Sequence, residues 1–155
     1  MAVEIERKFL ITPGAWSPRD AGDHIRQGYL SVAPDRTVRV RTRGVRGYLT
    51  VKGPTVGLSR PEFEYEIPFG DANEMLDRLC VAVLEKQRFL ESHGEHTWEI
   101  DVFLGLNDGL VVAEVEMDTE DEPVILPSWI DCEVTGDYRY NNSHLARVPF
   151  TTWAR

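Results

Sequence analysis

Cysteine is scarce in this chain of 155 residues, which has only Cys80 and Cys132. Two cysteines so far apart cannot build a disulfide framework or a metal knuckle, so we expect both to be small buried hydrophobes. No apolar run approaches the length of a membrane-spanning helix. Charges begin at Glu4, which does not fit a signal peptide. These absences predict a cytoplasmic protein that does not enter a membrane.

A surplus of basic residues is also missing. The chain has 17 Lys and Arg against 26 Asp and Glu, a formal net charge of −9. A protein that coats nucleic acid or an anionic membrane carries a basic surplus, so the composition argues against both partners. The length and the 42% hydrophobic content are sufficient for a substantial core, and we expect one domain over residues 1–155.

The chain begins with an alternating segment at residues 3–10, VEIERKFL. In a strand, successive side chains point to opposite faces, so Glu4, Glu6 and Lys8 share one face. Two carboxylates and an ammonium in one row form a cradle for a divalent cation beside an anion. A half-buried strand with a solvated outer face would explain this segment equally well if the pattern stood alone.

The pattern recurs along the rest of the chain. Like charges stand two residues apart, on one strand face, in six places: Glu4 with Glu6, Arg39 with Arg41, Glu62 with Glu64, Lys86 with Arg88, Glu99 with Asp101, and Glu114 with Glu116. Such pairs are unfavourable unless an ion of opposite sign sits between their members. Carboxylates hold hard divalent cations and Arg grips phosphate bidentately, so the rows describe a site for a metal and a polyphosphate.

The expected fold is dominated by β-structure. The alternating segments give roughly eight strands, mostly in hairpin order, which predicts an antiparallel β-barrel or a strongly curved sheet. Asp71 and Glu74 form a capping box for a helix after the fifth strand, with an apolar stripe that packs on the core. A second, short helix is expected within residues 140–148.

Two architectures fit a period of two. The apolar faces would line the inside of a barrel that carries a greasy ligand, with the charged faces in water. Alternatively, the charged faces line a wet tunnel, and helices or a partner subunit cover the apolar faces outside. The strongly ionic composition of the polar faces favours the tunnel, and a homodimer would help to cover its outer faces.

The ordered motifs resemble the CYTH superfamily, the triphosphate tunnel metalloenzymes. The resemblance begins with the Glu-x-Glu-x-Lys signature at the N-terminus and covers nearly the whole chain. Its motifs are EIERKFL at 4–10, QGYL at 27–30, VRVR at 38–41, TVK at 50–52, the glutamates at 62 and 64, EKQRF at 85–89, EIDVF at 99–103, EVE at 114–116 and DYRY at 137–140. The fold that the resemblance implies is an eight-stranded antiparallel tunnel with a charged interior and a few peripheral helices.

The resemblance also implies roles for the charged residues. It assigns Mg²⁺ or Mn²⁺ to six carboxylates: Glu4, Glu6, Glu62, Asp101, Glu114 and Glu116. It assigns the phosphate chain to seven basic residues: Lys8, Arg39, Arg41, Lys52, Lys86, Arg88 and Arg139. A structural ion pair is the alternative for Arg139. For the general base, the family suggests Lys8 with Tyr29, and a metal-activated water assisted by Glu64 is the alternative.

The activity implied by the resemblance is hydrolysis of inorganic triphosphate to pyrophosphate and phosphate, by in-line attack of water. The short single-domain chain and the LSR-x-E stretch at 58–62 resemble the compact bacterial triphosphatases. Thiamine triphosphatase, nucleoside triphosphatase and class IV adenylate cyclase remain alternatives within the same fold. A polyphosphate-binding module without catalysis, or the carrier of apolar ligands, would be a different class of protein.

Overall fold

Antiparallel strands and a few short helices make up residues 2–154, the part of the chain that this computed structural model describes. The strands are β1 (Val3–Ile11), β2 (Asp23–Ala33), β3 (Arg36–Arg43), β4 (Arg46–Lys52), β5 (Ser59–Ile67), β6 (Val83–His93), β7 (His96–Phe103), β8 (Val111–Glu116) and β9 (Ile130–Glu133). The helices are α1 (Phe69–Arg78) and α2 (Asn142–Leu145), with 3-10 turns η1 (Gly105–Asn107), η2 (Tyr138–Tyr140) and η3 (Phe150–Thr152).

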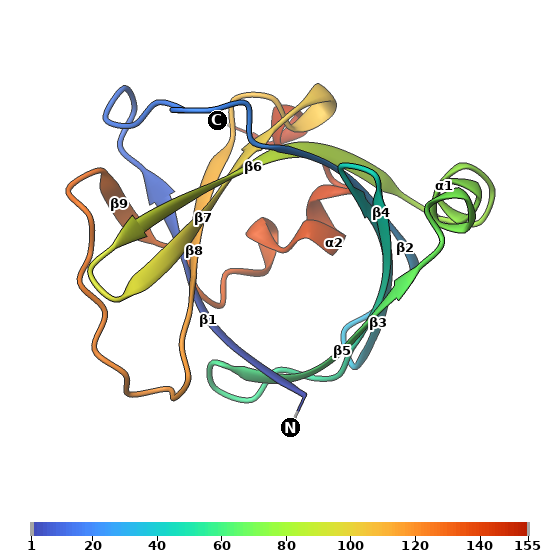
Figure 1. The fold of residues 1–155 in the computed structure, drawn as a ribbon, viewed down its shortest axis with the longest axis horizontal. Helices are drawn as coiled ribbons and strands as arrows, with labels where there is room; N and C mark the ends of the chain where they lie inside the picture. The colour runs from blue at the N-terminus through green and yellow to red at the C-terminus, as the bar shows by residue number, and fades with distance from the viewer. Residues whose placement is uncertain (1, 155) are drawn as a thin grey trace.

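Eight of these strands form a ring. The hydrogen-bonded order is β5-β4-β3-β2-β6-β7-β8-β1, and a further pairing of β5 with β1 joins the two ends (Figure 1). The ring confirms the expected eight-stranded antiparallel arrangement. The ninth strand, β9, pairs with the end of β1 outside the ring and was not expected from the sequence.

The register decides which face is inside. Residues directly opposite one another in an antiparallel pair point to the same side of the sheet. Lys8 of β1 stands opposite Glu114 of β8, and Lys52 of β4 stands opposite Glu62 of β5. These ionic residues line the interior of the ring, so the chain has the charged-tunnel arrangement and not the apolar-carrier arrangement.

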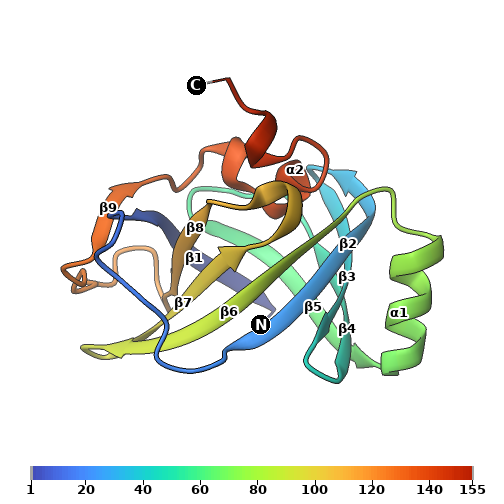
Figure 2. The same ribbon diagram turned by 90° about the horizontal axis from the view of Figure 1, so that it is seen from above.

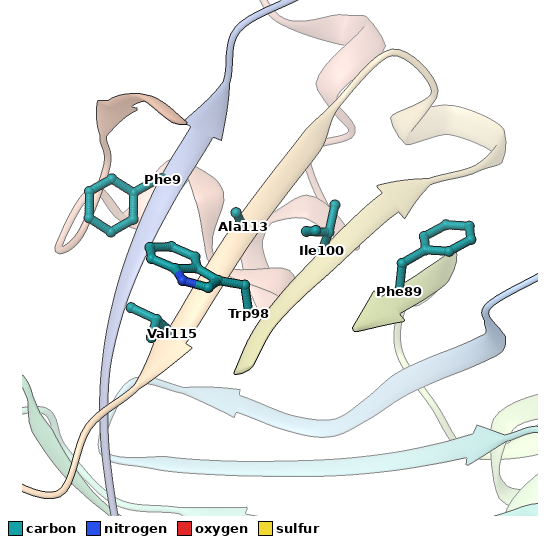
Figure 3. Close-up of a cluster of buried hydrophobic side chains, with 6 residues drawn as sticks. All are labelled: Phe9, Phe89, Trp98, Ile100, Ala113 and Val115. Atoms are coloured by element: carbon teal, nitrogen blue, oxygen red, sulfur yellow. The ribbon is translucent and has the colours of Figure 1, made fainter. Parts of the chain in front are cut away.

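Much of the apolar packing lies on the outer side of the ring. One cluster is built on β1, β6, β7 and β8 from Phe9, Phe89, Trp98, Ile100, Ala113 and Val115 (Figure 3). Trp16, from the loop after β1, and Trp129, beside β9, pack against this cluster. The chain itself therefore covers this outer face of the sheet.

Helix α1 covers a second part of the outer face, over β2, β3 and β4 (Figure 1). Its buried residues Ala72 and Leu76 pack against Val40 of β3. The approach is so close that a Cβ at Gly47 of β4 would lie 2.8 Å from the Ala72 methyl carbon. Gly47 is therefore required for the helix to sit this close to the sheet.

The C-terminal segment closes one end of the ring. Figure 2 shows α2 and the following residues gathered at one end, while Figure 1 places α2 within the outline of the ring. Leu145 of α2 is fully buried in a cluster with Leu84, Phe103, Leu110 and Val112. The interior is thus apolar at this end and ionic beyond it.

Two expectations about local structure were wrong. Helix α1 begins at Phe69, and its N-cap is Pro68 without a side-chain hydrogen bond, so Asp71 and Glu74 form no capping box. Asp71 instead lies in the first turn, where its charge suits the helix dipole. Cys132 is exposed on the short strand β9 and Cys80 is half-buried, so neither is the fully buried residue that was expected.

Among the described residues, no helix is long and apolar enough to cross a membrane.

Candidate active site

A cavity of about 160 Å³ occupies the ionic part of the ring. Seven carboxylate residues line it: Glu4, Glu6, Glu62, Glu64, Glu99, Glu114 and Glu116. Seven cationic residues line it as well: Lys8, Arg39, Arg41, Lys52, Arg60, Lys86 and Arg88. Tyr29, Thr37, Asn141, Asn142 and Ser143 complete the lining.

The cavity brings together nearly all the residues that the sequence suggested. Asp101 and Arg139 are the exceptions, because neither lines the cavity. Arg60 and Glu99 do line it, although no role was assigned to them from the sequence. Glu99 belongs to the alternating EIDVF motif, so the face shared with Asp101 was a usable signal. Arg60 precedes the glutamate row by two residues on β5, which places it on the same face.

Two carboxylates face each other across the β1–β8 pair without a cation between them. Glu6 stands directly opposite Glu116, and neither forms a hydrogen bond or ion pair with another residue of the part described here. Burial, then the charges of Glu114 and Glu4, outweigh the opposing charges of Lys8 and Lys52 and raise the pKa of Glu6 well above its usual range. Burial, then Glu99 and Glu4, also raise the pKa of Glu116. The ionised forms of both residues are therefore unfavourable beside the surrounding carboxylates, and a bound cation would stabilise them.

Lys52 bridges two other carboxylates. Its Nζ lies 3.0 Å from Glu4 Oε2 and 3.1 Å from Glu62 Oε2. Burial raises the pKa of Glu4 despite the opposing charge of Lys52. Burial also acts to raise the pKa of Glu62, but contacts with Glu4 and Lys52 outweigh it and the net pKa is lowered. The strands β1, β4 and β5 thus present two carboxylates and one ammonium to the same wall of the cavity.

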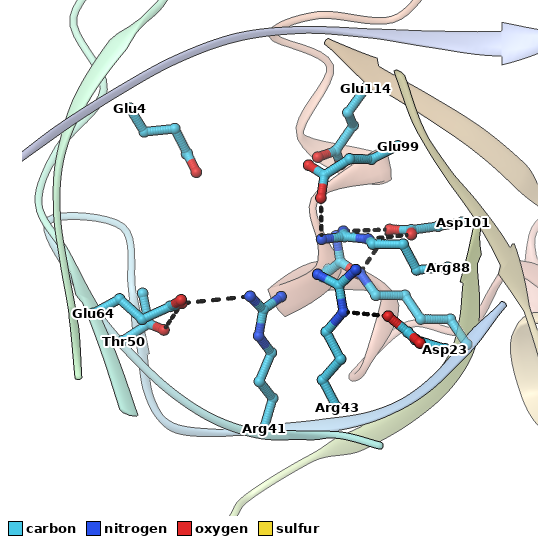
Figure 4. Close-up of polar contacts among 12 residues, drawn as sticks. Glu4, Asp23, Arg41, Arg43, Thr50, Glu64, Arg88, Glu99, Asp101 and Glu114 are labelled. Atoms are coloured by element: carbon cyan, nitrogen blue, oxygen red, sulfur yellow. Dashed lines mark hydrogen bonds and ion pairs between the residues drawn. The ribbon is translucent and has the colours of Figure 1, made fainter. Parts of the chain in front are cut away.

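Glu64 on β5 is the centre of a polar cluster with two arginines and a threonine. Figure 4 shows its contacts with Arg41 and Thr50. Its Oε2 accepts from Thr50 Oγ1 at 2.8 Å, from Arg39 Nη2 at 3.2 Å and from Arg41 Nη2 at 3.5 Å. Burial acts to raise the pKa of Glu64, but Arg41, Thr50 and Arg39 outweigh it and hold the pKa below its usual range. Glu64 is therefore ionised and orients the two guanidinium groups.

The arginine groups retain donors for an anion. Arg39 Nε and Arg41 Nε are buried, and neither has a hydrogen-bond partner in the described part of the chain. Burial, then the neighbouring charges of Arg39 and Arg88, lower the pKa of Arg41 to about 10. A buried, partly unsatisfied guanidinium is costly, and a phosphate oxygen would supply the missing acceptor.

Arg88 on β6 is held by two acidic residues of the adjacent strand β7 (Figure 4). Asp101 accepts from Arg88 Nε at 2.7 Å and from Nη2 at 2.9 Å, whereas Glu99 accepts from Nη1 at 2.8 Å. Lys86 Nζ lies 2.8 Å from Asp101 Oδ2 and donates to Asn142 Oδ1 at 3.0 Å. Asn142, from the C-terminal segment, thereby contacts the basic row, a contribution that the strand pattern could not show.

Lys8 and Tyr29 both line the cavity, as the proposed base pair would require. Burial lowers the pKa of Lys8, but Glu114, Glu6 and Glu4 outweigh this effect and the net pKa is raised. Lys8 Nζ donates to the Tyr140 carbonyl at 3.1 Å and lies 3.6 Å from Glu114 Oε1. Lys8 is thus an ammonium at neutral pH and suits phosphate binding better than proton abstraction.

Arg139 lies away from the cavity. Its guanidinium pairs with Asp137, with Nη2 2.6 Å from Oδ2, and stacks over the rings of Tyr140 and Trp153. In this arrangement Arg139 forms the structural ion pair that was the alternative to phosphate binding.

The donor set of the cavity fits a hard divalent cation. Its carboxylates supply oxygen ligands only, which suit Mg²⁺ or Mn²⁺. Within residues 2–154, no three His, Cys, Asp or Glu side chains converge closely enough to hold a metal by themselves. This agrees with the usual binding of Mg²⁺ through one or two carboxylates, with waters and substrate phosphates as the other ligands.

Comparisons with known proteins agree with this site. The CYTH domain matches residues 2–145. An inorganic triphosphatase of Acetivibrio thermocellus is 48% identical over 97% of this chain and 97% of its own length. An inorganic triphosphatase of Nitrosomonas europaea is 35% identical over 92% of this chain and 96% of its own length.

A solved structure agrees as well. The crystal structure of the inorganic triphosphatase NE1496 superposes with a TM-score of 0.66 and 32% identity, covering 94% of this chain and 95% of that one. The family match over nearly the whole chain, the two relatives and the ring of eight strands point the same way. The chain belongs to the CYTH domain family.

Proposed function

We propose that this chain is an inorganic triphosphatase that hydrolyses tripolyphosphate with a divalent cation, Mg²⁺ or Mn²⁺. The observation that carries the proposal is the cavity itself, in which a group of carboxylates and a group of Lys and Arg side chains share one small volume. A metal–triphosphate complex has the complementary distribution of charge. The two relatives named inorganic triphosphatase support the same substrate.

The metal would be held by Glu6 and Glu116, with Glu4 and Glu114 on the same two strands and Glu62 on β5 also lining the cavity. The first two have no cation partner among the described residues, whereas Glu4 and Glu62 pair with Lys52 and Glu114 pairs with Lys8. When bound, the ion supplies Lewis-acid neutralisation of phosphoryl oxygens. Asp101 is not included, because its oxygens already accept from Arg88 and Lys86.

The phosphate chain would lie along the basic groups that line the cavity. These are Lys8, Arg39, Arg41, Lys52, Arg60, Lys86 and Arg88. Phosphoryl transfer needs little covalent chemistry from the protein, because positioning and neutralisation of charge supply most of the rate enhancement. Arg139 stays outside this set in our proposal, since Asp137 holds it away from the cavity.

The attacking water would be oriented by Glu64 and Tyr29. Glu64 Oε2 is occupied by three donors, whereas Oε1 accepts no hydrogen bond from a residue of the described chain and is the atom we assign to the water. The Tyr29 hydroxyl accepts from Gln27 Nε2 at 2.9 Å, so its own proton remains available to a phosphate or a water. Lys8, as an ammonium, neutralises charge on the phosphate.

The lining also favours an inorganic substrate over a nucleotide. Tyr29 is the only aromatic residue among the described residues that line the cavity. Recognition of a nucleobase or of thiamine usually adds aromatic stacking or a dedicated set of polar contacts. This cavity offers mainly ionic groups. These groups bind phosphates but make no specific contact with an organic group attached to a triphosphate.

The experiment that tests the function is phosphate release from tripolyphosphate, ATP and thiamine triphosphate, each with Mg²⁺, with Mn²⁺ and with a chelator. We expect metal-dependent turnover that is fastest on tripolyphosphate and yields pyrophosphate and phosphate. Glu4→Ala should be strongly impaired, whereas Glu66→Gln, at an exposed residue paired with Arg46, should be close to wild type. Cyclic AMP and pyrophosphate from ATP would indicate the cyclase, and metal-dependent binding without turnover would indicate a binding module.

A further inference from the structure

Asp101 is the most buried carboxylate of the ionic region, with 1% of its surface exposed. It stands on β7 opposite Arg88 of β6 on one side and Val112 of β8 on the other. Val112 belongs to the apolar cluster that closes one end of the ring. Asp101 therefore lies at the boundary between the apolar end and the cavity, behind the residues that line it.

The oxygens of Asp101 are already occupied. Oδ1 accepts from Arg88 Nε at 2.7 Å, and Oδ2 accepts from Arg88 Nη2 at 2.9 Å and lies 2.8 Å from Lys86 Nζ. A cation that approached these oxygens would have to displace a bidentate guanidinium and an ammonium. Glu6 and Glu116 line the cavity without such partners in the described chain and are better placed to accept a metal.

We propose that Asp101 is a positioning residue, not a metal ligand: it fixes Lys86 and Arg88 so that their remaining N–H groups point to the phosphate chain. The inference rests on the proposed function of the cavity. An Arg side chain has five N–H donors. Asp101 takes two from Arg88 and Glu99 takes one, which leaves two for a phosphate.

The same reasoning applies to Lys86. Of its three N–H donors, one is directed to Asp101 and one to Asn142 Oδ1, at 3.0 Å, so one remains. Lys86 is only 1% exposed, and it still lines the cavity. A buried ammonium with two fixed partners has little freedom, so its third donor has a defined direction. Loss of the Asp101 charge would release both cations from this arrangement.

The test is Asp101→Asn, which keeps the size of the side chain and removes its charge. We expect KM for tripolyphosphate to rise by about tenfold or more, because bidentate guanidinium contacts to phosphate depend on exact placement. We expect kcat at saturating substrate to change less. The affinity for Mn²⁺ alone, measured by electron paramagnetic resonance on protein without substrate, should stay within about twofold of wild type.

Glu6→Gln is the matched comparison for metal binding, and its Mn²⁺ affinity should fall by about tenfold or more. Asp77→Asn is the matched control for loss of an Asp–Arg ion pair, because Asp77 pairs with Arg26 on the outside of the ring. It should leave both KM and Mn²⁺ affinity unchanged. The proposal is overturned if Asp101→Asn loses Mn²⁺ affinity to the same extent as Glu6→Gln.

Asp101→Asn removes the charge that pairs with Lys86 and Arg88 and is expected to lower the stability of the fold, so a double variant is included. In Lys86→Gln with Asp101→Asn, the charges of the ammonium and the carboxylate are removed together. Because Asp101 would act partly through Lys86 and partly through Arg88, the rise in KM of the double variant should be smaller than the product of the two single-variant effects. Fully additive effects on KM would contradict the proposal.

The design separates this inference from the proposed function. If the wild-type protein did not hydrolyse tripolyphosphate, the function would fail, but calorimetric titration with tripolyphosphate and the Mn²⁺ titration would still be informative. Weaker tripolyphosphate binding with unchanged Mn²⁺ binding in Asp101→Asn supports the positioning role. Unchanged binding of both, in a folded variant, overturns it.

Discussion

Glu6 of β1 stands directly opposite Glu116 of β8 inside the ring, and neither carboxylate forms a direct ion pair with a cation in the described part of the chain. Other carboxylates in the ring do have one: Glu4 and Glu62 share Lys52, and Glu114 lies beside Lys8. Like charges directly opposite one another destabilise a sheet. Burial and neighbouring carboxylates therefore make the ionised forms of Glu6 and Glu116 unfavourable in the protein alone, and a divalent cation would stabilise them.

The first prediction is that Glu6→Gln stabilises the protein in the presence of a chelator while it abolishes most activity. Removing one of the two facing charges should add roughly 0.5–1 kcal/mol to the free energy of unfolding, or about 2 °C in Tm. Turnover with Mg²⁺ or Mn²⁺ should fall by about 100-fold or more, because the metal supplies several kcal/mol of stabilisation to the transition state. Thermal unfolding with a chelator and phosphate release with metal measure the two effects.

Glu74→Gln is the control for this variant, because Glu74 pairs with Arg78 on the exposed face of α1. It should change neither turnover nor, beyond a few tenths of a kcal/mol, stability. A Glu6→Gln protein that is less stable than wild type with chelator present would mean that the carboxylate pair is relieved by contacts within the chain, and the metal assignment would lose its main support.

The second prediction concerns the pH dependence of metal binding. Burial and neighbouring carboxylates raise the pKa of both Glu6 and Glu116, so these groups hold protons at a higher pH than ordinary glutamates. A metal binds the ionised carboxylates and must displace those protons. Mn²⁺ affinity should therefore rise with pH, by up to about tenfold per pH unit for each proton released, until both groups are ionised.

Calorimetry in buffers of different ionisation enthalpy would count the protons directly. Mn²⁺ binding should release protons, with the count falling as pH rises, and the count should be smaller in Glu6→Gln. Metal binding without proton release at any pH would show that these carboxylates are already ionised, or that they do not bind the metal.

The third prediction concerns Thr50, which is fully buried between the arginines and the glutamate row. Its hydroxyl donates to Glu64 Oε2 at 2.8 Å and accepts from Arg39 Nη2 at 3.1 Å. Thr50→Val keeps the shape and removes both hydrogen bonds. We expect KM for tripolyphosphate to rise about five- to tenfold, since about 1–1.5 kcal/mol is typical for a lost hydrogen bond next to a charged group.

Thr152→Val is the comparison for Thr50→Val, because the Thr152 hydroxyl donates to the Pro149 carbonyl in an exposed turn. It should leave the steady-state constants unchanged. Equal KM values for Thr50→Val and wild type would show that Arg39 and Glu64 hold their positions without the hydroxyl.

The strand pattern predicted most of the ring and most of its ionic lining, because a period of two places alternate residues on one face wherever the strand runs. Glu4, Glu6 and Lys8 are an example, since their shared face follows from spacing alone. Spacing could not separate the tunnel from the apolar carrier. The register between strands decides that, because it brings Lys8 opposite Glu114 and buries Trp98 on the other side of the sheet.

The alternating strand pattern could not predict other parts of the site. Asn142 contacts Lys86 only because the C-terminal segment turns into the end of the ring, a tertiary arrangement without a local sequence signal. Glu99 and Asp101 share one strand face, but only Glu99 lines the cavity, since the neighbours of Asp101 across the sheet are Arg88 and Val112. Side chains on one face differ in depth along the ring, and the sequence does not show where the apolar end begins.

The last prediction is a loss of substrate affinity at alkaline pH that originates at Lys86. Burial lowers the pKa of this ammonium to about 8, although Asp101 acts in the opposite direction. A lowered Lys pKa means that the side chain is charged below this pH and neutral above it, so kcat/KM for tripolyphosphate should fall as pH rises through about 8. The profile of kcat/KM reports groups of the free enzyme, and Lys8 cannot cause this limb, because its pKa is raised.

Lys86→Arg separates this titration from ionisation of the substrate itself. A guanidinium stays protonated throughout the range and can keep the contact with Asp101, so the alkaline limb should move to higher pH in the variant. Ionisation of tripolyphosphate is common to both proteins and cancels in the ratio of their kcat/KM values at each pH. A ratio that stays constant from neutral to alkaline pH would show that Lys86 keeps its proton throughout, whereas a ratio that rises in favour of the variant through about pH 8 would assign the limb to this residue.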